Sequence, residues 1–224
     1  MGTDNLFHKR KAKQARDLQR RRAMRAAYDK VLIVCEGEKT EPNYFNELKD
    51  HYRLNSANIK VTGECDSDPL SVFEYSRQKY REAKDAGDPY DRVYCVFDRD
   101  RHTNYLQALD TIARAQPNTT YFSVTSVPCF EYWLLLHFVY TNQPFHATGD
   151  NSICTKVIQE LKQYWPDYEK GASSIFTRLL DQIDFAKSNA KRALQSAEEN
   201  HTENPCTRVH ELVDYLQNLT SQKN

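Results

Sequence analysis

Two short apolar runs that end in acidic residues place the strongest constraint on this chain. Residues 31–35 read VLIVC and are followed by Glu36, and residues 93–97 read VYCVF and are followed by Asp98 and Asp100. A short, continuous apolar run rich in β-branched residues is typical of a buried strand. In open α/β sheets, ligands bind just beyond the carboxyl ends of the strands. The sequence therefore predicts that these carboxylates meet at one edge of a sheet.

The other predicted elements favour an α/β fold. Helical patterns alternate with further strand-like runs over residues 41–53, 59–63, 70–86, 104–115 and 119–124. This alternation predicts a small, mostly parallel, Rossmann-like sheet flanked by helices. A buried helix is predicted over residues 130–140, and a helical C-terminal part is predicted from patterns over residues 153–164, 174–199 and 207–219. We expect three regions, namely an N-terminal arm (1–29), a core (30–140) and a helical part packed on the core (141–224).

The cysteine and hydropathy patterns favour a cytoplasmic protein. The six cysteines are spread without a C-x-x-C pair, and Cys35 and Cys95 lie inside the apolar runs, where cysteine acts as a small hydrophobe. Disulfides and a zinc knuckle are therefore not expected, which fits a reducing compartment. No apolar run approaches the roughly 20 residues of a membrane span, and no apolar stretch follows the basic N-terminus as in a secretory signal. We expect no membrane partner.

The balanced net charge conceals a basic arm. The chain has 31 basic and 31 acidic side chains, but residues 1–30 carry ten Lys or Arg against three Asp or Glu. Such a run is usually a solvated tail or helix face. It is read equally well as an arm that binds the phosphate backbone of nucleic acid, because basic clusters supply sequence-independent affinity. The candidate contact residues are Lys9, Arg10, Lys11, Lys13, Arg20, Arg21, Arg22 and Arg25.

The acidic residues have the chemistry of a divalent-metal site. If the second strand continues through Asp100, then Asp98 and Asp100 point to the same face, and two close carboxylates repel unless a cation or a proton separates them. Glu36 directly follows the first strand. Hard oxygen ligands of this kind suit Mg²⁺ or Mn²⁺. Glu38 is expected to be a solvent-exposed acid at a helix entry, and Glu41 is a second-rank candidate facing the sheet edge.

An acid and a histidine interrupt the apolar segment 128–138. A carboxylate such as Glu131 needs a metal or a charged neighbour in these surroundings, and it would start a helix near the same sheet edge. His137 lies six residues further on, about two-thirds of the way round a helix, so the two side chains do not share a face. We therefore interpret His137 as a core histidine first, and as structural or proton-relay support for catalysis second.

These residues resemble the RloB-like family. The matching stretches lie between about residues 30 and 220 and are VCEGEKTEPNYF at 34–45, FDRD at 97–100, SVPCFEYWLLLHF at 126–138, YEK at 168–170 and NPCTRV at 204–209. Residues 126–128 are predicted to form a turn after the strand, and Val127 departs from the family pattern, which has asparagine in this turn. More broadly, a strand ending in Glu-Gly and a later strand ending in Asp-x-Asp is similar to the TOPRIM domain of topoisomerases, primases and related nucleases.

The resemblance implies a TOPRIM-like catalytic core in a nuclease of prokaryotic anti-phage defence, often encoded beside an ATPase partner. It assigns Glu36, Asp98 and Asp100 as metal ligands, and Glu131 is a further candidate ligand. Lys170 would neutralise a transition-state phosphate, a role common for lysine in phosphoryl transfer.

We therefore expect an Mg²⁺- or Mn²⁺-dependent phosphodiesterase acting on nucleic acid. RNA such as tRNA is slightly favoured over DNA, because small defence toxins often act on RNA. The alternative is a non-catalytic nucleotide- or metal-binding module that docks on the ATPase. A strand transferase would need a tyrosine that none of the fourteen tyrosines clearly supplies. Whether the chain forms a homo-oligomer is left open.

Overall fold

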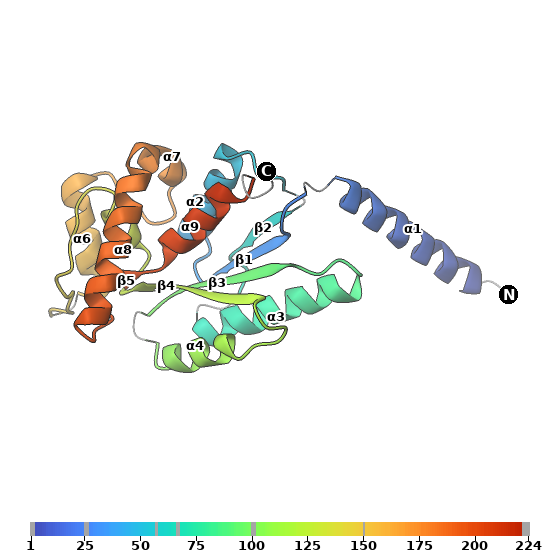
Figure 1. Ribbon diagram of the computed structural model, residues 1–224, viewed down its shortest axis with the longest axis horizontal. Helices are drawn as coiled ribbons and strands as arrows, with labels where there is room; N and C mark the ends of the chain where they lie inside the picture. Colours follow the sequence, from blue (N-terminus) through green and yellow to red (C-terminus); the bar gives the residue numbers. More distant parts are fainter. Residues whose placement is uncertain are drawn as a thin grey trace.

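The computed structural model describes residues 3–24, 27–56, 58–65, 68–99, 102–149 and 151–220 (Figure 1). Within these ranges five strands form one sheet in the order β2-β1-β3-β4-β5. Their bounds are β1 Val31–Cys35, β2 Ile59–Thr62, β3 Arg92–Asp98, β4 Tyr121–Val127 and β5 Cys206–Thr207. The first four strands are parallel, and β5 is antiparallel to β4. The predicted α/β class is confirmed, and the mostly parallel sheet is consistent with a Rossmann-like fold.

Helices cover both faces of the sheet. Their bounds are α2 Thr40–His51, α3 Pro69–Asp85, α4 Tyr105–Ala113 and α9 Val209–Asn218. Leu32 and Val34 of β1 pack with α3 and α4, whereas Val31, Ile33 and Cys35 pack with α2 and α9, because alternate side chains of a strand face opposite sides. Figure 1 shows these two helical layers on opposite sides of the strands. Burial on both faces explains why the strand is a continuous apolar run.

The C-terminal part is mainly helical and lies beyond the carboxyl ends of the parallel strands (Figure 1). It follows α5 (Glu131–Leu135), and its elements are α6 Ile153–Tyr164, α7 Ile175–Leu179, a 3₁₀ helix Leu180–Gln182 and α8 Ile183–Glu199. A carboxylate from another helix caps α7, because Oε2 of Glu47 accepts hydrogen bonds from the backbone amides of Phe176 (2.9 Å) and Thr177 (3.3 Å). This contact joins the C-terminal part to α2.

Two predicted elements have different bounds in the structure. The helix predicted over 130–140 ends at Leu135, and the carbonyl of Leu136 accepts a hydrogen bond from Nδ2 of Asn189 (2.9 Å) instead of continuing the helix. The strand predicted over 119–124 begins at Tyr121, because Thr119 has a φ of 64°, which a strand does not allow. It then continues to Val127, into the turn predicted at residues 126–128.

Two further differences concern the C-terminal part. The helix predicted over 174–199 is divided by the 3₁₀ helix Leu180–Gln182. The helix predicted over 207–219 begins only at Val209, because Thr207 pairs with Ser126 as part of β5. The two side-chain hydroxyls also lie 3.0 Å apart. The division of the chain into arm, core and C-terminal part stays a prediction.

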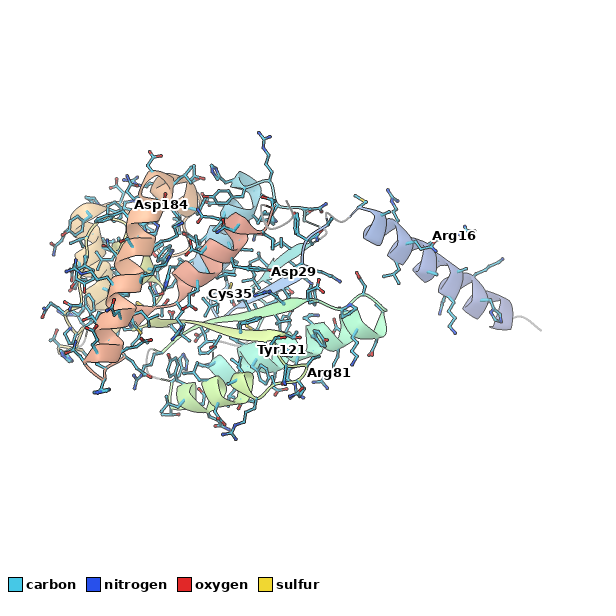
Figure 2. All side chains as sticks on the ribbon, in the orientation of Figure 1. Arg16, Asp29, Cys35, Arg81, Tyr121 and Asp184 are labelled. Atoms are coloured by element: carbon cyan, nitrogen blue, oxygen red, sulfur yellow. The ribbon has the colours of Figure 1, made fainter. Side chains whose placement is uncertain are left out.

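The basic arm forms the helix α1 (Thr3–Ala23), which projects from the body (Figure 1). Figure 2 shows Arg16 on this helix and Cys35 at the end of β1. The helix lies beyond the opposite end of that strand, where β1 begins. The helix has 21 residues but is strongly charged. Among the residues that the structure describes, no helix combines the length and apolar character needed to cross a membrane.

Candidate functional site

The carboxyl ends of β1 and β3 bring two of the predicted acids together. Cys35 pairs with Val96, and the backbone amide of Glu36 donates to the Val96 carbonyl (2.9 Å). The backbone amide of Asp98 donates to Oε2 of Glu36 (3.0 Å). Nε2 of His102 lies 2.7 Å from the other oxygen, Oε1. Both carboxylate oxygens of Glu36 are therefore held in place.

Glu131 joins this edge of the sheet from the chain that follows β4. It is the first residue of α5, and the residue is only 2% exposed. The hydroxyl of Tyr168 donates to its Oε1 (3.1 Å), and Nζ of Lys170 lies 3.3 Å from the same oxygen. The buried carboxylate thus has the charged neighbour that its apolar surroundings require.

Glu41 is a fourth acid at this edge, and it is more central than its second rank in the sequence analysis suggests. It lies in the first turn of α2 and is 7% exposed. A Cβ atom on Gly37 would lie 2.1 Å from Oε2 of Glu41, so only glycine at position 37 leaves room for this carboxylate. Glu38, by contrast, is exposed, as expected.

Two of the acids, Asp98 and Glu41, have a raised pKa. Burial raises the pKa of Asp98 well above its ordinary value, and the charges of Glu41, Glu131 and Glu36 raise it further. Burial also raises the pKa of Glu41 to about 7; a backbone hydrogen bond and Lys170 oppose this rise, whereas Glu131 and Glu36 add to it. Burial alone would lower the pKa of Lys170, but the neighbouring Glu131 carboxylate raises it overall. The site therefore favours an additional proton or cation.

A cavity of about 520 Å³ opens onto these side chains. Among the described residues, no three His, Cys, Asp or Glu side chains are already arranged to hold a metal ion. The donor chemistry nevertheless fits one, because the carboxylates that line the cavity repel one another and oxygen donors suit Mg²⁺ or Mn²⁺. Asp100 lies outside the described residues. The described part of β3 ends at Asp98, so the side-by-side arrangement of Asp98 and Asp100 stays a prediction.

The chain that carries Lys170 is fastened to the start of α2. The backbone amide of Gly171 donates to Oγ1 of Thr40 (2.9 Å), and Nδ2 of Asn43 donates to the Gly171 carbonyl (3.3 Å). Gly171 has a φ of 75°, and a Cβ atom there would lie 3.0 Å from Cβ of Lys39. Glycine is therefore favoured by both the backbone conformation and the close approach of Lys39. This contact holds Lys170 at the cavity wall.

A comparison with family models covers most of the chain. The model described as RloB-like protein matches residues 31–216. The chain belongs to the RloB-like family. Searches of curated proteins and of solved structures found no match. The matched span of this RloB-like protein contains the cavity acids Glu36, Glu41, Asp98 and Glu131 together with the exposed Glu38 and with Lys170, and it begins after the basic arm.

His137 is not brought to the cavity. The residue is 1% exposed, its Nδ1 lies 3.0 Å from the Trp133 carbonyl, and its ring packs edge-on against the Trp133 ring. Burial lowers its pKa to about 4, although two backbone hydrogen bonds oppose this change. His137 is therefore a neutral core residue, as its first interpretation has it. The geometry gives no basis for including it among the catalytic residues.

The arm residues lie on the side of the sheet where β1 begins, away from the acids at the strand ends. Those with described side chains are exposed, namely Lys9, Arg10, Lys11, Lys13 and Arg20. The side chains of Arg21 and Arg22, and all of Arg25, lie outside the described residues. The arm leads into the start of β1, whereas the acids follow the ends of the strands (Figure 1). A role of the arm in binding nucleic acid stays a prediction.

Sequence reasoning missed His102 and ranked Glu41 too low. His102 lies in the connection after β3, where no periodic pattern indicates which way a side chain points. For Glu41 a signal was present, because an acid in the first turn after a strand-Glu-Gly run returns toward the strand end. The role of Gly37 in admitting this carboxylate emerges only from the three-dimensional contact.

Proposed function

We propose that this RloB-like protein is a metal-dependent phosphodiesterase that cleaves nucleic acid with a TOPRIM-like catalytic edge. The observation that carries the proposal is the convergence of Glu36, Glu41, Asp98 and Glu131 on one cavity, with Lys170 in its wall. Burial raises the pKa of Asp98, the charges of Glu41, Glu131 and Glu36 raise it further, and this supports a cation as their partner. Phosphodiester cleavage combines such a cation with a nearby basic side chain.

Glu36, Asp98 and Glu131, together with Asp100, would hold the Mg²⁺ or Mn²⁺ ion. When bound, the ion would supply Lewis-acid activation of the scissile phosphate and of water. His102 and the Asp98 amide orient the Glu36 carboxylate by holding both of its oxygens.

The part of the cavity lined by Glu131 and Lys170 would position the substrate. Tyr168 and Lys170 hold the Glu131 carboxylate, and the Lys170 side chain is 58% exposed, so its ammonium group is accessible to a phosphate in the cavity. A cation placed there stabilises negative charge that develops on the phosphate oxygens.

Nucleic acid as the substrate is supported by the family membership and by the basic arm. RNA, such as tRNA, is slightly favoured over DNA. By the same resemblance, the protein would be an effector of anti-phage abortive infection that works with an ATPase. Neither inference follows from the carboxylates.

Cleavage assays with a conservative variant test the proposal. Wild-type protein should cleave labelled RNA or DNA only with added Mg²⁺ or Mn²⁺, and Asp98→Asn should lower the rate on the order of 10²–10³-fold or more. Asp85→Asn, the same change at an exposed position at the end of α3, should keep the wild-type rate. Equal activity of Asp98→Asn and wild type would overturn the mechanism.

Metal binding provides a second measurement that does not depend on activity. Calorimetric titration with Mn²⁺ should show binding to wild type and to Asp85→Asn, and much weaker binding to Asp98→Asn. Mn²⁺ binding without cleavage of any nucleic acid, even after addition of an ATPase, would favour the non-catalytic regulatory module instead.

A further inference from the structure

The acidic cavity and the basic arm lie at opposite edges of the sheet. The cavity is formed by residues that follow the ends of β1, β3 and β4. The arm helix α1 instead leads into the start of β1, and Figure 1 shows it extending away from the helices around the cavity. A short stretch of nucleic acid therefore does not reach both.

The near end of the arm is fastened to the amino edge of the sheet. Nδ2 of Asn55 donates to the Met24 carbonyl (2.6 Å), and Nδ2 of Asn58 donates to the Tyr28 carbonyl (2.7 Å). Asn55 and Asn58 lie just before β2, and Asn58 is 1% exposed. These contacts determine where the arm leaves the body.

The dimensions of the two elements give the separation. The five residues of β1 span about 16 Å at 3.3 Å per residue. The 21 residues of α1 span about 31 Å at 1.5 Å per residue, so half of α1 and the length of β1 together give roughly 30 Å between the middle of the arm and the cavity, before the connecting residues 24–30 are added. Successive phosphates of one strand lie about 3.4 Å apart along a duplex axis, so this separation corresponds to roughly nine base pairs.

The family comparison divides the chain at the same point. The matched residues, 31–216, include the whole cavity and none of the arm helix. The arm nevertheless carries the basic surplus of the chain, and its described basic side chains are exposed. The cavity and the arm are thus separate parts, each with the charge for a different task.

We infer that this protein selects long duplex or folded nucleic acid, which reaches from the cavity to the arm, over short fragments. The inference rests on the proposed function. The arm would contact the phosphate backbone roughly nine base pairs from the cleaved bond, and this contact would not depend on sequence. A stem shorter than about five base pairs, which covers about 16 Å, would reach only the cavity.

Binding of two DNA hairpins, to which the B-form spacing applies, tests the inference. Fluorescence anisotropy with the full chain should show at least about tenfold tighter binding of a stem of about 30 base pairs than of one of about five. Replacing Lys9, Arg10 and Lys13 by glutamine should reduce this ratio to below about threefold and lower the salt slope by about 3. The matched control replaces three exposed basic residues of the body by glutamine, namely Arg114, Lys162 and Lys191. It should keep the ratio.

A cross-linking experiment measures the separation directly. A photoreactive residue in place of Lys13 should attach to the long hairpin roughly nine base pairs from the cleavage position. Attachment within about three base pairs, equal binding of the two hairpins, or an unchanged ratio in the arm variant would overturn the inference. Length-dependent binding without metal-dependent cleavage would instead contradict the proposed function and leave the length selection standing.

Discussion

The carboxyl edge of the sheet and the amino edge are built in different ways. At the carboxyl edge, acids far apart in the sequence are brought together by the strand register, as for Glu36 and Asp98, which are 62 residues apart. At the amino edge, one continuous helix carries the basic residues and is fastened by Asn55 and Asn58. The acidic site therefore depends on the whole fold, whereas the arm depends on local helix formation. Changes at the carboxyl edge should alter stability and activity together, and changes in the arm should alter affinity alone.

The largest expected effect lies at the carboxyl edge, at Gly37. An alanine there would place its Cβ 2.1 Å from Oε2 of Glu41, so the buried carboxylate must move from its place at the cavity. We expect Gly37→Ala to lower the free energy of unfolding by about 3 kcal/mol and to abolish Mn²⁺ binding. Chemical denaturation and calorimetry measure the two effects.

Gly149→Ala is the matched control, because it replaces glycine by alanine at a position where the added Cβ contacts no described atom. Gly149 has a φ of 58° but no described atom within 4 Å of its added Cβ, so alanine there carries only the conformational cost, about 1 kcal/mol. Equal losses of stability in the two variants would show that Glu41 is not confined by Gly37.

The stability of the protein should also depend on pH, through the buried residues His137 and Glu41 on the same side of the molecule as the cavity. The pKa of His137 is lowered by burial to about 4 from 6.5, so below pH 6.5 the unfolded chain binds a proton that the folded protein rejects. The free energy of unfolding should therefore fall as the pH drops from about 6.5 to 4, by up to about 3 kcal/mol from this residue. Glu41, with its raised pKa, acts in the opposite direction.

The contribution of His137 is measured as a difference between variants. Denaturation curves of wild type and His137→Phe should differ by an amount that changes with pH over this range. His146→Gln, at an exposed position, should follow the wild-type curve. A pH-independent difference between wild type and His137→Phe would contradict a buried neutral imidazole.

The parts of the molecule that could be predicted from sequence are those with a strong local pattern. The runs 31–35 and 93–97 were correct because strands buried on both faces are continuously apolar, and parallel pairing then places Glu36 beside Asp98. The two-residue strand β5 has no such pattern and exists because Thr207 pairs with Ser126. The early end of α5 depends on Asn189, more than fifty residues away. Such long-range contacts leave no local trace in a sequence.

Two tyrosines donate hydrogen bonds to glutamates, one buried near the cavity and one at the surface elsewhere, so their loss can be compared. Tyr168 donates to the buried Glu131 (3.1 Å), and Tyr75 donates to Glu64 at the surface (3.0 Å). Tyr168→Phe should lower the free energy of unfolding by about 2 kcal/mol, because a buried carboxylate loses a hydrogen bond. Tyr75→Phe should cost below about 0.5 kcal/mol. Thermal or chemical unfolding distinguishes the two, and similar costs would mean that Glu131 is effectively solvated.

The smallest expected effect on stability is in the arm itself. Replacing Lys9, Arg10 and Lys13 by glutamine should change the free energy of unfolding by less than about 0.5 kcal/mol, because these side chains are exposed and glutamine is also a good helix former. Asn58→Ala, in the anchor below the arm, should cost about 1–2 kcal/mol, because the buried amide that bonds the Tyr28 carbonyl is lost. If neutralising the arm destabilised the protein as much as removing the anchor, the arm would pack on the body, and the separation of basic arm and acidic cavity would no longer hold.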